Sequence, residues 1–169
     1  MSKTQNNTET AILAAGCFWG VQFYYDQVPG VLKTEVGYIG GHVDHPTYEQ
    51  VCSHTTGHAE ATKITYDPAK VSYEKILQHF FRIQDPTAKN VPDGVNIGDN
   101  YRSAVFYTSD KQKTIVEMMI DHLNKSGIYK APIVTTVEKA TTFWPAEAYH
   151  QKYTERTGIG ACHVDYAPV

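Results

Sequence analysis

Residues 10–30 of the chain read TAILAAGCFWGVQFYYDQVPG, and this stretch decides how the fold begins. Its opening residues, 10–15, are short and mostly apolar, which predicts a strand that runs directly into Gly16. Apolar side chains at three- and four-residue spacing then predict a helix that ends at Pro29-Gly30; they are Phe18, Val21, Tyr25 and Val28. The stretch therefore predicts a strand and a helix joined by a tight turn.

The rest of the chain continues this alternation. Strands are predicted over residues 31–39, 59–66, 101–107 and 133–137. Helices are predicted from a cap at Ser72 to a break before Pro86, from a capping box of Ser109 and Gln112 to Asn124, and from Pro145 to just before Gly158. A single helical turn is expected over residues 47–51 and a long loop over 87–100. The interleaving predicts one domain, an α/β or α+β sandwich of one sheet with helices packed against it.

Composition and charge exclude several classes of protein. The 169 residues are 41% hydrophobic and 20% charged, with a net charge of -3, as in ordinary globular domains. They contain no basic stripe of the kind that nucleic acid requires. The longest apolar stretch, residues 11–21, is about half as long as a membrane span. Because the polar segment 1–9 lacks the apolar core of a secretion signal, we expect a cytoplasmic protein with no membrane or nucleic-acid partner.

The three cysteines, Cys17, Cys52 and Cys162, are widely spaced. An odd number at this spacing argues against a disulfide framework and against a four-thiolate zinc site. The predicted turn places Cys17 at the start of a helix, where backbone N–H groups and the helix dipole favour the thiolate. Glycines on both sides, Gly16 and Gly20, let another molecule approach the sulfur closely. Cys17 is therefore a candidate nucleophile, and the alternative is a buried core cysteine.

The run Gly16-Cys17-Phe18-Trp19-Gly20 after a short apolar strand resembles the signature of the A-type peptide methionine sulfoxide reductases. Further blocks stand in the order of that family: Gly37-Tyr38-Ile39-Gly40-Gly41, Pro46-Thr47-Tyr48, Val51-Cys52-Ser53, Gly57-His58-Ala59-Glu60, Tyr66-Asp67-Pro68 and Tyr101-Arg102-Ser103. The resemblance covers residues 11–162. It implies a single α+β catalytic domain over residues 1–169, with a mixed sheet, a ferredoxin-like βαβ core and long coil segments. It also implies an enzyme that reduces methionine-S-sulfoxide, free or in proteins, in the repair of oxidative damage.

The chemistry of sulfoxide reduction explains why such an enzyme needs these residue types. The sulfoxide oxygen leaves poorly as a bare anion, so thiolate attack requires an acid or hydroxyl donors at that oxygen. The resemblance makes Glu60 the proton donor, whose pKa burial must raise, and Tyr48 and Tyr101 the hydroxyl donors. Without it, the residues alone favour an exposed carboxylate and two core aromatics. Phe18 and Trp19 would hold the methyl group of the substrate.

Oxygen transfer leaves Cys17 as a sulfenic acid, which a second thiol must convert into a disulfide. We expect Cys162 to be that resolving residue, because it lies in a glycine-containing, flexible C-terminal tail, residues 157–169, much like the tail cysteine of the family. Cys52 occupies a block whose cysteine has no general catalytic role, so we expect it to be structural, although its proximity to the site in sequence leaves open a role as a competing resolver. The resemblance implies a monomer without cofactor or metal, reduced by thioredoxin or, in vitro, by dithiothreitol.

The chain departs from the family pattern in one place. The family usually has aspartate, a spacer and glycine before Gln-Tyr-Arg-Ser, whereas this chain has Asn96-Ile97-Gly98 and then Asn100-Tyr101-Arg102-Ser103. Asn96 can hydrogen-bond a water molecule or the sulfenic oxygen, but it cannot carry a negative charge. Asp99 is close enough in sequence to substitute for the missing carboxylate. We expect Asn96 to belong to the catalytic set and to slow the turnover of the sulfenic intermediate.

Three other interpretations start from the same residues. A metal-binding module would use the imidazole and thiolate groups of one short stretch, but their spacing matches no familiar zinc pattern; they come from His42, Asp44, His45, Cys52, His54 and His58. A cysteine hydrolase would use Cys17 with a histidine base and would not need Cys162. A noncatalytic domain with a reactive surface thiol would reduce no sulfoxide. The ordered family blocks favour the reductase over all three.

Overall fold

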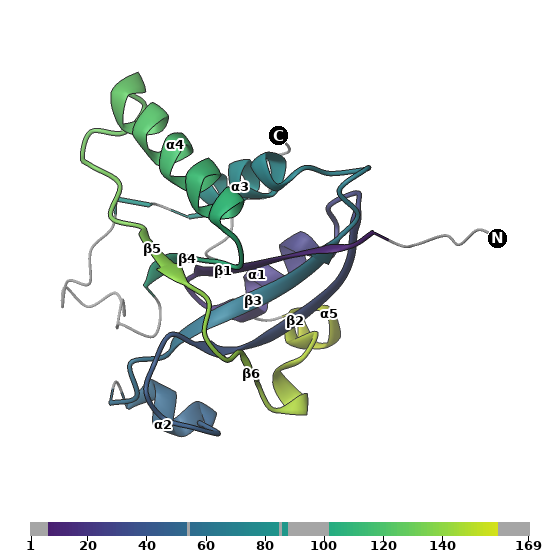
Figure 1. The fold of residues 1–169 in the computed structure, drawn as a ribbon. Helices are drawn as coiled ribbons and strands as arrows, with labels where there is room; N and C mark the ends of the chain where they lie inside the picture. The colour runs from purple at the N-terminus through teal and green to yellow at the C-terminus, as the bar shows by residue number, and fades with distance from the viewer. Residues whose placement is uncertain (1–6, 54, 85, 88–101, 159–169) are drawn as a thin grey trace.

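The fold is a twisted sheet with a layer of helices on one face (Figure 1). The computed structural model describes residues 7–53, 55–84, 86–87 and 102–158. Within these ranges the strands are β1 (Glu9–Ala15), β2 (Val31–Ile39), β3 (Ala59–Tyr66), β4 (Ser103–Tyr107), β5 (Thr136–Lys139) and β6 (Trp144–Pro145). The helices are α1 (Phe18–Tyr25), α2 (Tyr48–Cys52), α3 (Tyr73–Arg82), α4 (Asp110–Ser126) and α5 (Tyr153–Thr157), with a 3₁₀ turn, η2, at Ala148–His150.

The central strands have the ferredoxin-like arrangement that the resemblance implies. β1 and β2 both pair antiparallel with β3, which therefore lies between them, and α1 forms the crossover from β1 to β2. β4 pairs antiparallel with the other side of β1, and β5 adds in parallel to β4. The full order among the described residues is β5-β4-β1-β3-β2-β6. The predicted α+β fold with a mixed sheet and a split βαβ core is confirmed.

Alternation of side chains along the strands divides the core between the two faces of the sheet. On the face covered by α1, α3 and α4, Leu13 and Ile64 are fully buried against helix side chains such as Phe80. On the opposite face, a smaller cluster around Phe106 is covered by Phe143 and its neighbours. The helix-covered face is the one on which Cys17 begins α1.

The helix predicted from Pro145 onwards is wrong. Trp144–Pro145 pair with β2 as strand β6, Ala148–His150 form η2, and a helix begins only at Tyr153. Lys152 has a φ of 59°, a left-handed conformation that interrupts any continuous α-helix. The physical reason is that backbone groups here bond to β2 and to a side chain of α1 instead of to carbonyls four residues back.

The other predicted helices and strands are present, with shifted ends. α1 ends at Tyr25 and β5 begins at Thr136, each about three residues from its predicted boundary. The predicted capping box at the start of α4 is only half formed. Ser109 accepts from the backbone N–H of Gln112, but the Gln112 side chain turns to other backbone groups. Most of the loop predicted over 87–100 lies outside the described residues, as does most of the 157–169 tail.

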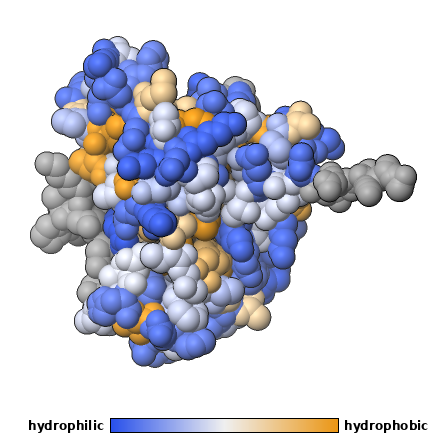
Figure 2. Space-filling view, in the orientation of Figure 1, coloured by the Kyte–Doolittle hydropathy of each residue, from blue (hydrophilic) through white to orange (hydrophobic). Residues whose placement is uncertain are grey.

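Hydrophilic side chains cover most of the face drawn in Figure 2, and hydrophobic ones form separate patches. The large hydrophobic side chains that stand exposed in the described ranges are Leu32, Met118, Ile128 and Tyr149. None of the helices in those ranges has both the length and the apolar character that a membrane crossing requires.

Gly37 allows β6 to lie close to β2, and its substitution tests how firmly the two strands are joined. A Cβ atom at Gly37 would lie 2.4 Å from the carbonyl oxygen of Trp144 and 2.6 Å from the Phe143 ring. The carbonyl oxygen of Trp144 is a backbone atom, so a Cβ at Gly37 would force the backbone of β6 to move. Gly37→Ala should therefore destabilise the fold by about 1–3 kcal/mol in denaturant unfolding. Lys33→Ala, at an exposed position of the same strand, should stay within about 0.5 kcal/mol of the parent protein. Equal stability of the two variants would contradict this packing.

Candidate active site

Cys17 is the N-cap residue of α1, directly after β1. Its backbone is extended, with φ -60° and ψ 123°, and the preceding Gly16 has a φ of 90° that a side chain would disfavour. The predicted strand, turn and helix around this thiol are therefore confirmed. At an N-cap the thiol lies beside the unpaired N–H groups and the positive end of the helix dipole, both of which favour its thiolate form. The residue is half-buried, so the sulfur is placed between core and solvent.

Glu60 is the carboxyl group that the fold brings next to this helix start. It lies in β3 opposite Tyr38 of β2, and only 1% of its surface is exposed. Its carboxyl oxygen Oε1 accepts a hydrogen bond of 3.3 Å from the backbone N–H of Phe18, the residue after Cys17. Burial in an apolar setting favours the neutral, protonated form of a carboxyl group. The geometry joins a thiol at a helix N-cap to a buried carboxyl group.

Aromatic rings form a wall beside the thiol. The indole N–H of Trp19 donates to Nδ1 of His150 at 2.9 Å, and the Trp19 ring stacks on Tyr153 with centroids 4.0 Å apart. His150 also lies against Tyr48, with centroids 4.3 Å apart, and against Phe18 at 5.4 Å. Phe18 is buried, whereas Trp19 and Tyr48 are partly exposed. The predicted substrate residues and one predicted hydroxyl donor are thus brought together around a histidine.

His150 is held in its neutral form by this packing. Since Nδ1 accepts from Trp19, the ring proton resides on Nε2, which is buried and has no hydrogen-bond partner among the described residues. Burial lowers the pKa of His150 below its ordinary value of 6.5, and the opposing effect of the Glu147 carboxylate is smaller. A protonated ring would point a second N–H at the indole N–H of Trp19, so the Trp19 contact requires the neutral form.

Glu147 fixes the helix that carries Tyr48. Its Oε2 accepts from the backbone N–H of Tyr48 at 3.0 Å, and its Oε1 accepts from the hydroxyl of Tyr38 at 2.8 Å. Burial by itself would raise the pKa of Glu147, but the hydrogen bonds from the backbone and from Tyr38 lower it overall. The same contacts act on Tyr38, whose pKa is raised by burial first and by its bond to Glu147 second. An ionised carboxylate therefore ties α2 to β2 beside the thiol.

Cys52 ends α2, four residues after Tyr48, and is half-buried. Burial raises the pKa of its thiol, and a hydrogen bond with Tyr48 opposes this rise without cancelling it. The Glu147 carboxylate, and Glu60 once it is ionised, raise the pKa further, so this thiol is less ionised at neutral pH than an ordinary cysteine. These contacts place Cys52 at the edge of the candidate site and favour its thiol form.

Several predicted site residues cannot be placed. Tyr101, Asn96 and Cys162 lie outside the described residues, and so does Asp99. The neighbouring Arg102 is described, and its guanidinium donates to the carbonyl oxygen of Gly57 at 3.0 Å. This bond connects the start of β4 to the turn before β3, the strand that carries Glu60.

In the histidine-rich stretch between β2 and β3, the His58 ring bonds to backbone groups of the same stretch. The ring of His58 accepts from the backbone N–H of Gly41 at 3.0 Å through Nδ1 and contacts the carbonyl oxygen of Val43 at 2.7 Å through Nε2. Both ring nitrogens are therefore engaged within the protein. In the ranges that the structure describes, no three His, Cys, Asp or Glu side chains are grouped closely enough to hold a metal ion.

Sequence reasoning missed Tyr38, Glu147, His150 and Tyr153. The last three lie in segment 144–157, most of which the sequence pattern predicts to be one helix. A signal was nevertheless present, because Trp144, Tyr149 and Tyr153 crowd this segment together with a glutamate and a histidine, directly after a region of predicted coil. Such a density of aromatic and titratable side chains is more typical of a site wall than of a surface helix.

The chain resembles known proteins along nearly its whole length. Residues 9–169 match the family model described as "Peptide methionine sulfoxide reductase". The chain is 49% identical over 154 residues to "Peptide methionine sulfoxide reductase MsrA" of Geobacter sulfurreducens, an alignment that covers 91% of this chain and 94% of that one. It is similar in structure to Mxr1 from Saccharomyces cerevisiae in reduced form, with a TM-score of 0.80, 29% identity, and coverage of 94% and 91%. Methionine sulfoxide reductase A of Corynebacterium diphtheriae gives a TM-score of 0.77, 30% identity, and coverage of 92% and 78%.

The neutral His150 predicts a specific loss of stability in mild acid. Because its pKa is lower in the folded protein than the ordinary 6.5, its contribution to stability is present above that value and is lost as the pH falls through the lowered pKa. His150→Asn keeps an acceptor for Trp19 but cannot titrate. Between about pH 7.5 and about pH 5.5 the parent protein should lose more unfolding free energy than this variant.

Urea unfolding at both pH values measures this difference. His79, whose pKa burial also lowers, is present in both proteins and cancels in the comparison. Equal losses in the two proteins would show that His150 is not held neutral by the fold.

Proposed function

The chain belongs to the peptide methionine sulfoxide reductase family and is an oxidoreductase, and we propose that it reduces methionine-S-sulfoxide, free or in proteins, with Cys17 as nucleophile. The observation that carries this proposal is the hydrogen bond from the Phe18 N–H to Glu60, which sets an acid beside the thiol. Membership confirms the resemblance found in the sequence. It also favours this activity over the cysteine hydrolase and the noncatalytic domain.

The first half-reaction transfers one oxygen atom. The Cys17 thiolate attacks the sulfoxide sulfur while Glu60 gives its proton to the sulfoxide oxygen, so that no bare oxide has to leave. The attack forms a sulfur–sulfur bond between Cys17 and the substrate. The protonated oxygen then passes to the Cys17 sulfur as the sulfur–oxygen bond of the substrate and the sulfur–sulfur bond break, which releases methionine and leaves Cys17 as a sulfenic acid. One thiol and one sulfoxide thus yield one sulfenic acid and one thioether. The N-cap position supports this step because it favours the attacking thiolate.

The substrate seat combines an apolar wall with hydroxyl donors. Phe18 and Trp19 would hold the methyl group of the oxidised methionine, and their packing around His150 supports that role. Tyr48 and Tyr101 would donate to the sulfoxide oxygen. For Tyr48 the support is its contact with the same histidine and the bond that Glu147 makes to its backbone. Tyr101 keeps the role that the family resemblance implies.

The second half-reaction restores the thiol. The sulfenic acid at Cys17 condenses with the Cys162 thiol to give a disulfide and water, and an external dithiol then reduces that disulfide. We infer thioredoxin as this reductant in the cell, with no resident cofactor. Asn96 would bond the sulfenic oxygen or its water. The raised pKa of Cys52 supports a structural role rather than a redox one. We further propose a single catalytic domain that acts as a cytoplasmic monomer.

Turnover with dithiothreitol tests the proposal most simply. The parent protein should reduce the S epimer of methionine sulfoxide and leave the R epimer untouched. Cys17→Ser should abolish turnover. Glu60→Gln preserves an acceptor for the Phe18 N–H but cannot donate a carboxylic proton, and it should lower kcat by about a hundredfold or more.

Cys52→Ser serves as the matched control, because it removes a thiol at the edge of the same site and should leave turnover with dithiothreitol nearly unchanged. Full activity of Cys17→Ser, or reduction of both epimers at equal rates, would refute the proposed function.

A further inference from the structure

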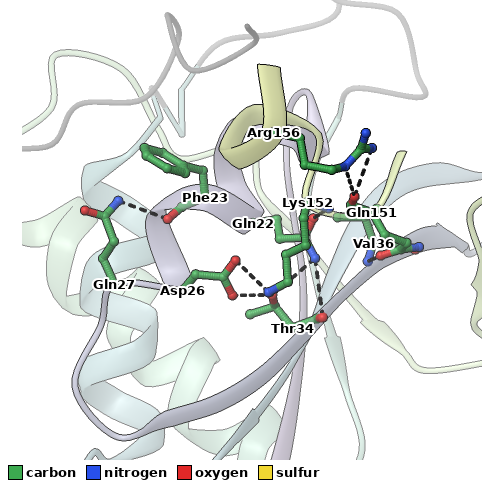
Figure 3. A network of polar contacts seen from close by, with 9 residues as sticks. All are labelled: Gln22, Phe23, Asp26, Gln27, Thr34, Val36, Gln151, Lys152 and Arg156. Carbon is green, nitrogen blue, oxygen red and sulfur yellow. Dashed lines mark hydrogen bonds and ion pairs between the residues drawn. The ribbon is translucent and has the colours of Figure 1, made fainter. Parts of the chain in front are cut away.

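Segment 144–157 is joined to α1 and β2 by a group of polar side chains, in addition to the packing of Ala146 and Trp144 against Phe18 and Val36. Figure 3 shows Lys152 of this segment close to Gln22 of α1 and to Asp26 at the C-cap of α1, and Gln151 close to Val36 of β2. The bonds from Gln151 to Val36 and from Lys152 to Gln22 connect positions 115 and 130 residues apart in the chain, and the bond between Thr34 and Asp26 lies close to the α1–β2 turn. The group therefore fixes where the segment lies relative to the helix that begins at Cys17.

Gln151 continues the sheet at the edge of β2 with its side chain. Its Oε1 accepts from the backbone N–H of Val36 at 3.0 Å, and its Nε2 donates to the carbonyl oxygen of Val36 at 2.9 Å. The same Nε2 also donates to the carbonyl oxygen of Ala146 at 3.1 Å. This amide thus bonds both backbone groups of Val36, whose carbonyl oxygen also accepts from the backbone N–H of Ala146, and it closes the segment on itself. Loss of this amide would remove the partner that the Val36 N–H has here and one of the two donors to the Val36 carbonyl oxygen.

Lys152, the next residue in the segment, is held by Gln22 through its backbone and by Asp26 through its side chain. Gln22 is 1% exposed, and its Oε1 accepts from the backbone N–H of Lys152 at 2.7 Å while its Nε2 donates to Thr34. The Lys152 ammonium lies 2.7 Å from Asp26 and 3.1 Å from the Thr34 hydroxyl. Lysine rarely adopts the left-handed backbone that Lys152 has here. These contacts hold it in that conformation.

The residues on either side of this anchor form the wall beside the thiol. His150, directly before Gln151, accepts from the Trp19 indole and packs on Tyr48. Tyr153, directly after Lys152, stacks on Trp19 with ring centroids 4.0 Å apart. A small shift of the anchored pair would therefore move both partners of Trp19 together. Displacements of about 1 Å at such a wall are enough to change reaction rates by large factors.

We propose that Gln151, with Lys152 and Gln22, is a positioning residue that sets the affinity of the site for oxidised methionine by holding His150 and Tyr153 against Trp19. This inference rests on the proposed function, because it assigns Trp19 to the substrate seat. Gln151 contacts backbone and not the reacting atoms, so its loss weakens substrate binding more than it slows oxygen transfer. The expected signature is a raised KM with a smaller change in kcat.

Gln112 supplies a matched control. Its side-chain amide also joins two distant backbone groups, accepting from Thr108 at 2.9 Å and donating to the carbonyl oxygen of Thr10 at 2.9 Å. Thr10 lies near the start of β1 and Cys17 follows its end, so this amide is about 20 Å from the thiol along the strand. Gln112→Met and Gln151→Met should lower the unfolding midpoint to a similar degree.

Only Gln151→Met should raise KM for methionine-S-sulfoxide, by about tenfold, with kcat changed less. The chain has two tryptophans, Trp19 and Trp144, so a Trp144→Phe background makes fluorescence report on Trp19 alone. In that background Gln151→Met should shift the emission to longer wavelength and increase quenching by acrylamide. Gln112→Met should do neither. The quenching measurement needs no turnover, so it tests the anchor even if the protein reduces no sulfoxide, an outcome that would refute the proposed function alone.

Lys152→Asn provides a second test of the proposal if the Gln151→Met variant does not fold. Asparagine tolerates the left-handed backbone but cannot reach Asp26, so the backbone is kept while the ion pair is lost. Loss of this partly exposed ion pair should raise KM by about two- to fivefold and increase Trp19 quenching, both less than Gln151→Met does. The proposal is overturned if Gln112→Met changes KM and Trp19 quenching as much as Gln151→Met does. It is equally overturned if neither segment variant changes them.

Discussion

The hydrogen bond from the backbone N–H of Phe18 to the Glu60 carboxyl group is the contact on which the site depends. It joins the first turn of α1 to β3, two elements about forty residues apart in the chain. Such a contact exists because the split βαβ arrangement inserts β3 between β1 and β2, directly under the crossover helix. The fold thereby sets a buried acid next to a thiol whose position at an N-cap favours its ionised form.

A second constraint comes from segment 144–157, which closes the site from the far end of the chain. Its Ala146 N–H donates to the Val36 carbonyl oxygen of β2 and its Lys152 N–H donates to the Gln22 side chain of α1, and these bonds prevent it from forming one helix. The segment contributes Glu147, which anchors Tyr48, and His150, which holds Trp19. The nucleophile and the acid thus come from the βαβ core. The aromatic wall depends on segment 144–157, which follows that core in the sequence and packs at the β2 edge of the sheet.

Much of the core could be predicted from the sequence because its elements bury one face in a regular pattern. The apolar periods of residues 10–28 predicted β1 and α1, and the alternation in residues 59–66 predicted β3. The burial of Glu60 could not be read from that alternation, since it depends on register with β2 and on the contact with Phe18. Segment 144–157 was misinterpreted because its conformation is set by side-chain bonds to distant backbone, which leave no periodic pattern. The family blocks predicted the proposed site residues, but not the histidine that contacts Phe18, Trp19 and Tyr48.

The most direct test of this account follows the oxygen atom. A Cys162→Ser variant, mixed without reductant with methionine-S-sulfoxide that carries a heavy oxygen isotope, should stop after one round. Mass spectrometry of the digested protein should then find one heavy oxygen on the peptide that contains Cys17, and one methionine released for each enzyme molecule. Release of methionine with the label absent from Cys17, or found on Cys52, would contradict the proposed role of the thiol at the start of α1.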